Sequence, residues 1–433
     1  MVRTTILITC LAALAACGGG DATLSGTASG PEQPNVLLII SDDQGVDASA
    51  QYPYSQDPPT TPTLDALAAQ GVVYDNMWAT PQCATTRACL ISGKFGQENG
   101  VPRTPGFLDP SVGTIQAHLA ADPATAHYAC GLFGKWHLRS GSSDADHPAT
   151  VGIGHYAGTL GVLDDYFDWP LVINGATLPE TAYHTSRVTD LAMEWIDQQT
   201  TPWFAWVAYA APHAPFHLPP ASLHSDESLT GGADDIQART RAYYLAMIEA
   251  MDTEIGRLLA SLPPAQRANT VVFFVGDNGT PRGATDVAVF PRDHTKSTFY
   301  EGGLRVPLIV AGAGISRQGQ RESALITATD FFATLADVTG ASAPVPTSSS
   351  SFRATFTTSG SGVRTHAYAE ELNDGVFHWA IRDARYKLLQ GANGVQELYD
   401  LRVDLREENN LLPGDAAMQA IAAGLSQATQ TIR

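Results

Sequence analysis

Basic residues are scarce in this chain of 433 residues, where 25 Lys and Arg stand against 44 Asp and Glu and give a formal net charge of -19. A surplus of negative charge of this size repels phosphate backbones and anionic lipid headgroups. The charge balance therefore argues against nucleic acid, or an anionic membrane surface, as the partner of the folded chain. If the chain binds a small anion, its few basic side chains must be concentrated at one place.

Cysteine is also rare, because the chain has five, too few for a disulfide scaffold at this length. Cys10 and Cys17 lie in the first residues, which leaves Cys83, Cys89 and Cys130 for the folded part. An odd number means that at least one thiol is unpaired or chemically used. Cys89 and Cys130 are either bridged to each other or buried as small apolar side chains.

Long apolar runs are missing after the N-terminus, where Ile6–Ala16 is apolar but too short to span a bilayer. Leu14-Ala15-Ala16-Cys17 resembles the lipobox of bacterial lipoproteins. We therefore expect residues 1–16 to be a lipoprotein signal peptide and Cys17 to carry the lipid. Residues 17–33, rich in Gly, Ser, Thr and Ala, would be a flexible tether. The chain would then be exported and held by its lipid at the cell envelope, on the outer membrane or the periplasmic face; an ordinary signal peptide is the alternative.

The chain does contain unbroken apolar runs of the length typical of strands buried on both faces. These runs are Asn35–Ile40, His127–Phe133, Trp203–Tyr209, Val271–Val275 and Val306–Val310. Helical patterns lie between them, the clearest over Arg241–Leu262 and another that opens at Thr61-Pro62. The alternation predicts an α/β fold for residues 34–340, with a large mixed, mostly parallel sheet sandwiched by helices.

Residues 341–362 turn to Ser, Thr, Pro and Ala, which is typical of a linker or a surface loop. Four short strand-like segments and one amphipathic helix follow this stretch. They are Ala367–Glu371, His378–Arg382, Tyr386–Gln390, Glu397–Leu401 and Asp415–Ile432. We expect residues 363–433 to form a small C-terminal α+β subdomain, a short antiparallel sheet with one helix.

Charged and amide side chains follow four of the predicted strands, directly after each strand ends. They are Asp42 and Asp43, Lys135 and His137, His213, and Asp277 and Asn278. Because ligands of open α/β sheets bind at the carboxyl ends of the strands, we expect these side chains to share one site.

Asp42, Asp43, Asp277 and Asn278 are hard oxygen donors. Gathered at one sheet edge they suit Ca²⁺, with Mg²⁺ as the alternative, better than Zn²⁺, which draws more His and Cys. A single doublet would more often cap a turn or a helix. Two doublets after buried strands favour a metal site.

Lysine and histidine at the same edge supply the positive charge that a bound anion needs. Lys135 suits the neutralisation of anionic oxygens, and His137 and His213 suit proton transfer to a leaving alcohol. The candidate nucleophile is Cys83, which stands just before a helix that we expect to begin near Thr85. The positive end of a helix dipole lowers the pKa of a thiol placed there.

Taken in order, these segments resemble the type I, formylglycine-dependent sulfatases of the alkaline phosphatase superfamily, from Pro34 to about Leu412. The matching motifs lie at the first strand, at the nucleophile, after the second, third and fourth strands, and near the C-terminus. They are Asn35–Asp43, Cys83–Gly93, Gly131–Leu138, Pro212-His213-Ala214-Pro215, Gly276-Asp277-Asn278-Gly279, Glu301-Gly302-Gly303, Glu397–Leu401 and Asn409-Asn410-Leu411.

The resemblance implies hydrolysis of a small anionic ester or a sulfated glycan. Cys83 would be oxidised to formylglycine by a maturation enzyme, and one hydroxyl of its hydrate would attack the sulfur. Arg87 would hold the hydrate, and Lys135 and Lys296 would bind the sulfate oxygens. His213 would protonate the leaving alcohol.

The resemblance also implies the remaining roles. His137 would take the proton from the second hydroxyl, so that the sulfated hydrate collapses and frees sulfate. Asp42, Asp43, Asp277 and Asn278 would hold Ca²⁺, with residue 83 completing the ligand set.

One residue departs from the family pattern, because Thr85 stands where the modification motif usually has Pro two residues after Cys83. Arg87, the other main recognition residue, is kept, so we expect conversion; an unmodified Cys83 thiolate would leave a weak or inactive protein. Two other functions are compatible with this sequence. One is a phosphonate or phosphate ester hydrolase on the same scaffold, and the other is an inactive surface lipoprotein that binds sulfated glycans.

Overall fold

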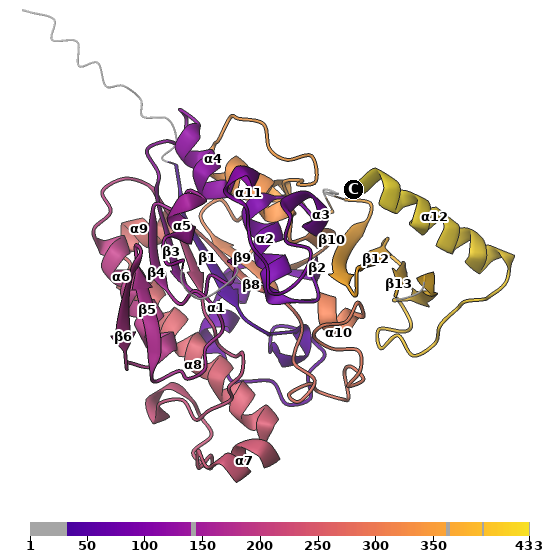
Figure 1. The fold of residues 1–433 in the computed structure, drawn as a ribbon, viewed down its shortest axis with the longest axis horizontal. Coiled ribbons are helices and arrows are strands. Elements are labelled where there is room, and N and C mark those ends of the chain that lie inside the picture. The colour runs from indigo at the N-terminus through magenta and orange to yellow at the C-terminus, as the bar shows by residue number, and fades with distance from the viewer. Residues whose placement is uncertain (1–32, 140–143, 361–363, 392–393, 433) are drawn as a thin grey trace, which may run out of the picture. The chain divides into compact units, whose positions relative to one another are not determined.

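A computed structural model describes residues 33–139, 144–360, 364–391 and 394–432 of the chain (Figure 1). The predicted signal peptide, the lipid-bearing Cys17 and all but the last residue of the predicted tether lie outside these described residues. Among the described residues, no helix has both the length and the apolar character that crossing a bilayer requires.

The centre of the fold is a ten-stranded sheet in the order β10-β2-β9-β8-β1-β7-β3-β4-β5-β6. β1 pairs in parallel with both β7 and β8, and β7 pairs in parallel with β3. The strands are β1 Asn35–Ser41, β2 Gly71–Trp78, β3 Ala129–Gly134, β4 His155–Gly158, β5 Trp169–Ile173, β6 Ala176–Glu180, β7 Trp203–Ala208, β8 Thr270–Gly276, β9 Leu308–Gly312 and β10 Gln320–Thr327. The predicted mixed, mostly parallel sheet is confirmed, with antiparallel pairing where β9, β5 and β6 join it.

β1 supplies side chains to the hydrophobic cores on both faces of the sheet. Val36, Leu38 and Ile40 are fully buried in one core, and Leu37 and Ile39 are fully buried in the other. Each such side chain stabilises the fold by about 1.5–3 kcal/mol relative to exposure. The unbroken apolar run is therefore explained by a strand that faces no solvent.

Helices cover both faces of this sheet. One core includes side chains from α2 (Cys83–Ser92), α4 (Ile115–Ala121) and α11 (Asp330–Thr339). The other includes side chains from α1 (Pro62–Gln70), α6 (His184–Asp197) and α8 (Thr240–Ser261). The shorter helices are α3 Gly96–Asn99, α5 His147–Thr150, α7 Ala233–Ala238, α9 Pro264–Ala268 and α10 Glu301–Leu304.

A second, antiparallel sheet follows near the C-terminus, where Figure 1 shows the yellow helix α12 (Ala416–Ile432) beside it. Its strands are β11 Ala367–Asn373, β12 Val376–Arg382, β13 Tyr386–Gln390 and β14 Gln396–Asp400. Ala422 and Leu425 of α12 pack with Leu388 and Leu398 of the sheet. The predicted small C-terminal sheet with one helix is confirmed.

A buried ion network ties this sheet to α10. Glu301 accepts from Arg305 Nε at 2.6 Å and from Lys387 Nζ at 3.2 Å, and Lys387 also pairs with Glu407 at 2.8 Å. Glu301 and Arg305 stand four residues apart and form a structural ion pair at the end of α10. These side chains are buried. Removal of one of them would therefore leave an opposite charge buried without its partner.

The segment after α11 carries no strand among its described residues, as expected of a linker or a loop, and has one 3₁₀ turn at Arg353–Phe356. It nevertheless contributes to the core, because Phe352 is 0% and Phe356 3% exposed. Residues 361–363 lie outside the described residues. The domain boundaries proposed from the sequence remain predictions.

Two predicted strands begin later than expected. The ladder of β9 begins at Leu308 rather than at Val306, because Pro307 has no N–H to donate. β3 begins at Ala129 rather than at His127, whose side chain is exposed. Cys83, Cys89 and Cys130 are all free thiols, so the bridge considered for Cys89 and Cys130 is not formed.

Glu371 of β11 gives a test of the C-terminal sheet by its pH dependence. The side chain is 1% exposed, neither carboxylate oxygen has a partner among the described residues, and burial raises its pKa from 4.5 to about 8. The folded state therefore holds this proton to a higher pH than the unfolded state, and stability falls as the pH rises from about 4.5 to about 8. We expect Glu371→Gln to raise the melting temperature at pH 8.5 far more than at pH 5.

The control is Glu194→Gln on the exposed face of α6, which should change the melting temperature little at either pH. An equal effect of Glu371→Gln at pH 5 and pH 8.5 would show that the buried carboxyl does not titrate in this range.

Candidate active site

The carboxyl ends of β8, β1, β7 and β3 are neighbours in the sheet, and the candidate residues follow them. The ion pairs and hydrogen bonds described below join Asp42, Asp43, Lys135, His137, His213, Asp277 and Asn278 from these strand ends with Cys83 and Arg87 from α2 and with Lys296 from the loop before α10. The structure therefore brings together every site residue expected from the sequence. The roles assigned to them remain predictions.

The four oxygen donors are buried, with exposures between 0% and 2%. Asp277 Oδ1 accepts from the backbone N–H of Asp43 at 3.0 Å, and Asn278 Nδ2 donates to Asp43 Oδ1 at 2.7 Å. Asp42 Oδ1 and Asn278 Oδ1 are buried without a hydrogen-bond partner among the described residues. An unsatisfied buried acceptor costs about 1–3 kcal/mol, so both oxygens are available to a ligand.

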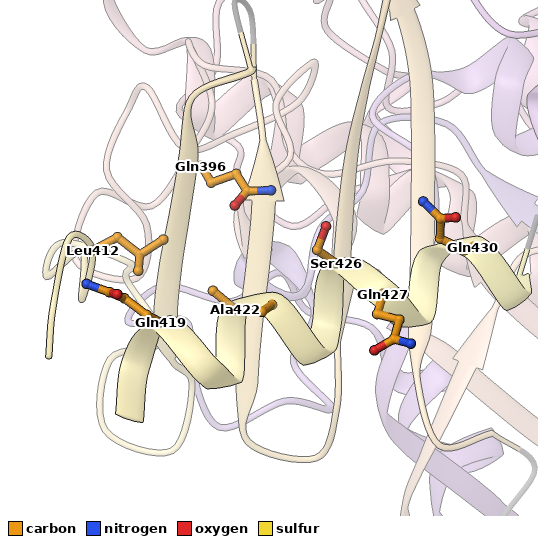
Figure 2. A pocket seen from close by; sticks show the side chains of 8 residues that line it. Gln396, Leu412, Gln419, Ala422, Ser426, Gln427 and Gln430 are labelled. Atoms are coloured by element: carbon orange, nitrogen blue, oxygen red, sulfur yellow. The ribbon is translucent and has the colours of Figure 1, made fainter. Parts of the chain in front are cut away.

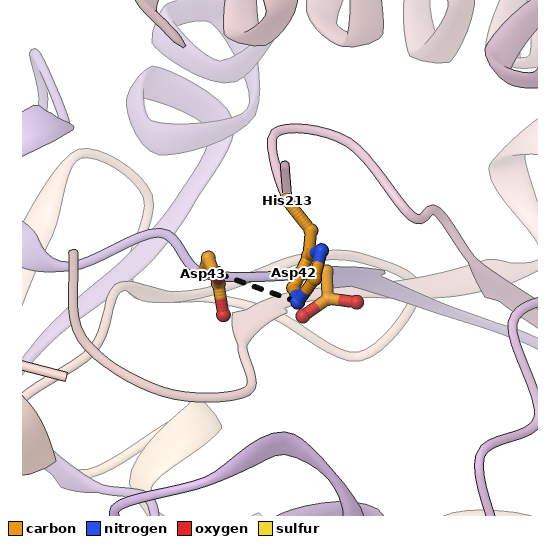
Figure 3. A group of neighbouring side chains, drawn as sticks. All are labelled: Asp42, Asp43 and His213. Atoms are coloured by element: carbon orange, nitrogen blue, oxygen red, sulfur yellow. Dashed lines mark ion pairs between the residues drawn. The ribbon is translucent and has the colours of Figure 1, made fainter. Parts of the chain in front are cut away.

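Ligand atoms of Asp42, Asp43 and His213 lie within 4.8 Å of one another, and so do those of Asp42, Cys83 and Asp277. Figure 3 shows the first group, with the dashed line marking the 3.8 Å pair between His213 Nε2 and Asp43 Oδ2. Among the described residues these are the two groups with this geometry, and they share Asp42. Because they share Asp42, the two groups lie at one place, where a single ion could contact ligand atoms of both.

Three cationic side chains face the carboxylates. Lys135 Nζ pairs with Asp42, Lys296 Nζ lies 2.5 Å from Asp43 Oδ1, and Arg87 Nη2 lies 2.8 Å from Asp277 Oδ2. Arg87 also donates from Nη1 to the carbonyl of Lys135 at 2.8 Å. The formal charges of the three pairs cancel.

These contacts set the pKa values of the acidic groups. Burial raises the pKa of Asp42, but Lys135 and then His213 oppose burial and bring it well below the ordinary value. Burial and the charge of Asp42 raise the pKa of Asp277 to about 7. The two carboxyls therefore titrate far apart, as neighbouring carboxyls in one site do.

The nucleophile candidate is the first residue of α2. Cys83 Sγ lies 3.2 Å from His137 Nδ1 and 3.8 Å from Lys135 Nζ. The expectation that the helix N-terminus lowers the thiol pKa is wrong, because burial raises the pKa of Cys83 to about 11 against the opposing effect of Lys135. Burial, followed by Lys135, lowers the pKa of His137 to about 2, so this imidazole is neutral.

Backbone strain is concentrated at the site. Asp43 (φ 70°), His137 (φ 59°) and Ser297 (φ 68°) adopt left-handed conformations that cost non-glycine residues free energy. At Gly134, which precedes Lys135, φ is 95° and a Cβ would lie 2.1 Å from the carbonyl oxygen of Ala208. The close approach lets the Lys135 N–H donate to that same oxygen at 2.8 Å.

Tyr166 is a positioning residue that the sequence did not single out for this purpose. Its hydroxyl lies 2.8 Å from the carbonyl oxygen of Ala210 and 2.7 Å from that of His213, so it fixes the loop after β7. His213 Nδ1 in turn donates to the carbonyl of Ala214 at 2.6 Å, which leaves Nε2 as the nitrogen that faces Asp43. The neighbouring His217 packs on the Tyr166 ring at 4.2 Å and contacts the Tyr183 hydroxyl instead.

A pocket of about 560 Å³ lies apart from these residues, between α12 and β14 (Figure 2). Its lining is made of amide, hydroxyl and aliphatic side chains, none of which titrates: Gln396, Leu412, Gln419, Ala422, Ala423, Ser426, Gln427 and Gln430. Among the described residues, this pocket therefore offers no group for acid–base chemistry.

A family model described as sulfatase matches residues 34–341. The chain belongs to the sulfatase family. A second family model, for the C-terminal region of N-sulphoglucosamine sulphohydrolase, matches residues 292–433.

Named relatives of this sulfatase agree with that assignment. Arylsulfatase G of Mus musculus is 27% identical over 379 residues, which cover 75% of this chain and 68% of the relative. N-acetylglucosamine-6-O-sulfatase of Bacteroides thetaiotaomicron is 24% identical over 482 residues, covering 88% and 83%. This sulfatase is thus grouped with the sulfuric ester hydrolases.

The fold is shared more widely. The crystal structure of the phosphonate monoester hydrolase of Agrobacterium radiobacter matches with a TM-score of 0.71 at 21% identity, covering 92% of this chain and 95% of that one. A match at this identity shows the fold alone. The fold is therefore compatible with more than one class of ester.

Removal of Arg87 tests how far the site depends on charge compensation. Arg87→Met would leave the buried carboxylates of Asp277 and Asp42 without this partner, so we expect the free energy of unfolding to fall by about 3–5 kcal/mol. Arg353→Met, which breaks an exposed pair with Asp337, should cost about 0–1 kcal/mol. Urea denaturation of the two variants measures both values, and equal losses would contradict this interpretation of the site.

Proposed function

We propose that this sulfatase hydrolyses an aryl or carbohydrate sulfate ester through a formylglycine that a maturation enzyme forms from Cys83. The supporting observation is the position of residue 83. It is the first residue of α2 and lies beside His137 and Lys135, and its Sγ falls within one group of ligand atoms with Asp42 and Asp277. A nucleophile at this position would lie next to a base (His137), a cation (Lys135) and the proposed metal ligands.

The residues present fit a divalent cation with oxygen ligands, and we propose Ca²⁺, with Mg²⁺ as the alternative, held by Asp42, Asp43, Asp277 and Asn278. Two of these side chains have a buried oxygen without a partner among the described residues. The site's formal charges cancel without the ion, so a divalent cation would leave a net positive charge for an anionic ester. When bound, the cation would polarise the nucleophile and offset the charge of the ester.

In this proposal, each side chain around residue 83 has a separate role. A formylglycine hydrate at position 83 would supply the oxygen nucleophile that a buried thiol does not. Lys135 and Lys296 would bind the sulfate oxygens, and Arg87 would hold the hydrate. His137, neutral and 3.2 Å from Cys83 Sγ through Nδ1, would accept a proton from residue 83.

His213 would donate a proton from Nε2 to the leaving alcohol. A sugar alcohol leaves as a strongly basic alkoxide and depends on this proton more than an aryl alcohol does. A carbohydrate ester is supported by the relative named N-acetylglucosamine-6-O-sulfatase.

Paired assays test this function. We expect the enzyme, co-expressed with a formylglycine-generating enzyme, to release sulfate from an aryl sulfate much faster than phosphate from the matching aryl phosphate. A chelator should abolish sulfate release and added Ca²⁺ should restore it.

His213→Ala should lower kcat on a sugar sulfate by about 10²–10⁴-fold, and should lower kcat on the aryl sulfate less.

The control is His127→Ala, an exposed histidine that follows α4. Its kcat should match that of the wild type. Faster release of phosphate than of sulfate would favour a phosphate or phosphonate ester hydrolase and overturn the proposal. Release of neither anion by the converted protein would favour a lipoprotein that only binds sulfated glycans.

A further inference from the structure

A pocket of about 360 Å³ adjoins the candidate nucleophile through His137, which lines it. The loop at Thr159–Val162 and the β5–β6 hairpin form its other walls, with Pro170, Val172 and Thr177 from the hairpin. The volume falls within the range of small-molecule sites, about 300–1,000 Å³. His137 thus borders both this pocket and residue 83, whose Sγ lies 3.2 Å from its Nδ1.

The lining of this pocket contains no Asp or Glu among the described residues, although the chain has 44 of them. The wall is made of hydroxyl, aliphatic and glycine residues, together with His137 and Arg139. Small apolar groups and hydroxyls suit the ring of a sugar. Arg139 is the one permanently charged residue among the described lining residues.

Arg139 has no ion pair with any described carboxylate. Its Nε and Nη1 atoms are closed to solvent and have no hydrogen-bond partner among the described residues. Arg87, the other arginine near residue 83, contacts Asp277 at 2.8 Å and Asp42 at 3.5 Å. A guanidinium with two unsatisfied, desolvated nitrogens is costly to the fold unless something pairs with it.

An anionic group of a ligand would offset that cost. The charge of the guanidinium is shared by its three nitrogens, so a carboxylate or a sulfate beside Nη2, which is not among those closed atoms, would pair with the whole group. Burial, opposed by Asp144, lowers the pKa of Arg139, which is the direction expected of a cation that lacks a close counterion.

We propose that this pocket binds the sugar next to the reacting ester and that Arg139 pairs with a second anionic group on that sugar, either a carboxylate or a second sulfate. The inference rests on the proposed function and narrows its substrate class to glycans with more than one acidic group. Arg139 is then a specificity-determining residue.

The test compares three sulfate esters of similar size: a neutral sugar with one sulfate, the same sugar linked to a uronic acid, and a disulfated sugar. We expect Arg139→Ala to lower kcat/KM on the acid-bearing esters by at least about tenfold more than on the neutral ester, as loss of a charged hydrogen bond does. Arg139→Lys should keep part of the preference. The acid-bearing ester on which Arg139→Ala loses more kcat/KM shows whether Arg139 pairs with the carboxylate or with the second sulfate.

Arg267→Ala is the matched control, because Arg267 is exposed on α9, before the amino end of β8, and does not line the pocket. It should leave all three rates unchanged. An equal loss on all three esters in Arg139→Ala, or no loss on the acid-bearing ones, would overturn the inference.

Calorimetric titration separates this inference from the proposed function. A desulfated sugar that carries a uronic acid and its neutral counterpart are each titrated into the full wild-type chain and into the Arg139→Ala variant. We expect the wild type to bind the acid-bearing sugar more tightly and Arg139→Ala to lose this preference, even if no sulfate ester is hydrolysed. Equal affinities of the wild type for the two sugars would contradict the proposed role of the pocket. Tighter binding of the acid-bearing sugar without any sulfate release would contradict only the proposed function.

Discussion

Three carboxylates and three cationic side chains lie together at the carboxyl ends of the central strands, and each charge is tolerable there only because of its opposite. Arg87, Lys135 and Asp277 are buried, and water cannot screen or solvate them. The pairs they form contribute little net stability, because desolvation consumes most of the Coulomb energy. Their value lies in the arrangement, because its formal charges cancel and a bound divalent cation would make it positive.

The surrounding fold is built to hold that arrangement. β1, which leads directly into Asp42 and Asp43, is closed to solvent, with apolar side chains packed into both cores. Strained backbone at Asp43 and His137 is tolerated because parallel strands on either side fix the chain just before these residues. Tyr166, from a different part of the chain, fixes the loop that carries His213. Packing elsewhere thus offsets the cost of charge and strain at the site.

The sequence predicted the parts of this structure whose cause is local. β1, β7 and β8 could be identified from unbroken apolar runs, because central strands are buried on both faces. β2 and the edge strands β6 and β10 were not identified, since they mix apolar with polar residues, as in Gln320–Thr327. The helix at Cys83 was expected within two residues of its observed start, but the direction of the thiol pKa was wrong, because burial raises this pKa more than Lys135 lowers it. Arg139 could not be recognised either, since its lack of an ion pair with any described carboxylate follows from how the chain folds around it.

The proposed chemistry depends on whether residue 83 becomes an aldehyde although Thr85 stands in the usual place of Pro. Thr85 donates from Oγ1 to the carbonyl of Gln82 at 2.8 Å and lies in the first turn of α2, where a helix requires no backbone N–H donor. The position of Thr85 in the first turn is thus one where the helix itself does not exclude Pro. Mass spectrometry of the peptide containing residue 83, after co-expression with that enzyme, is the most direct test. We predict formylglycine at position 83, and a thiol alone in a preparation that still hydrolyses sulfate esters would contradict the account.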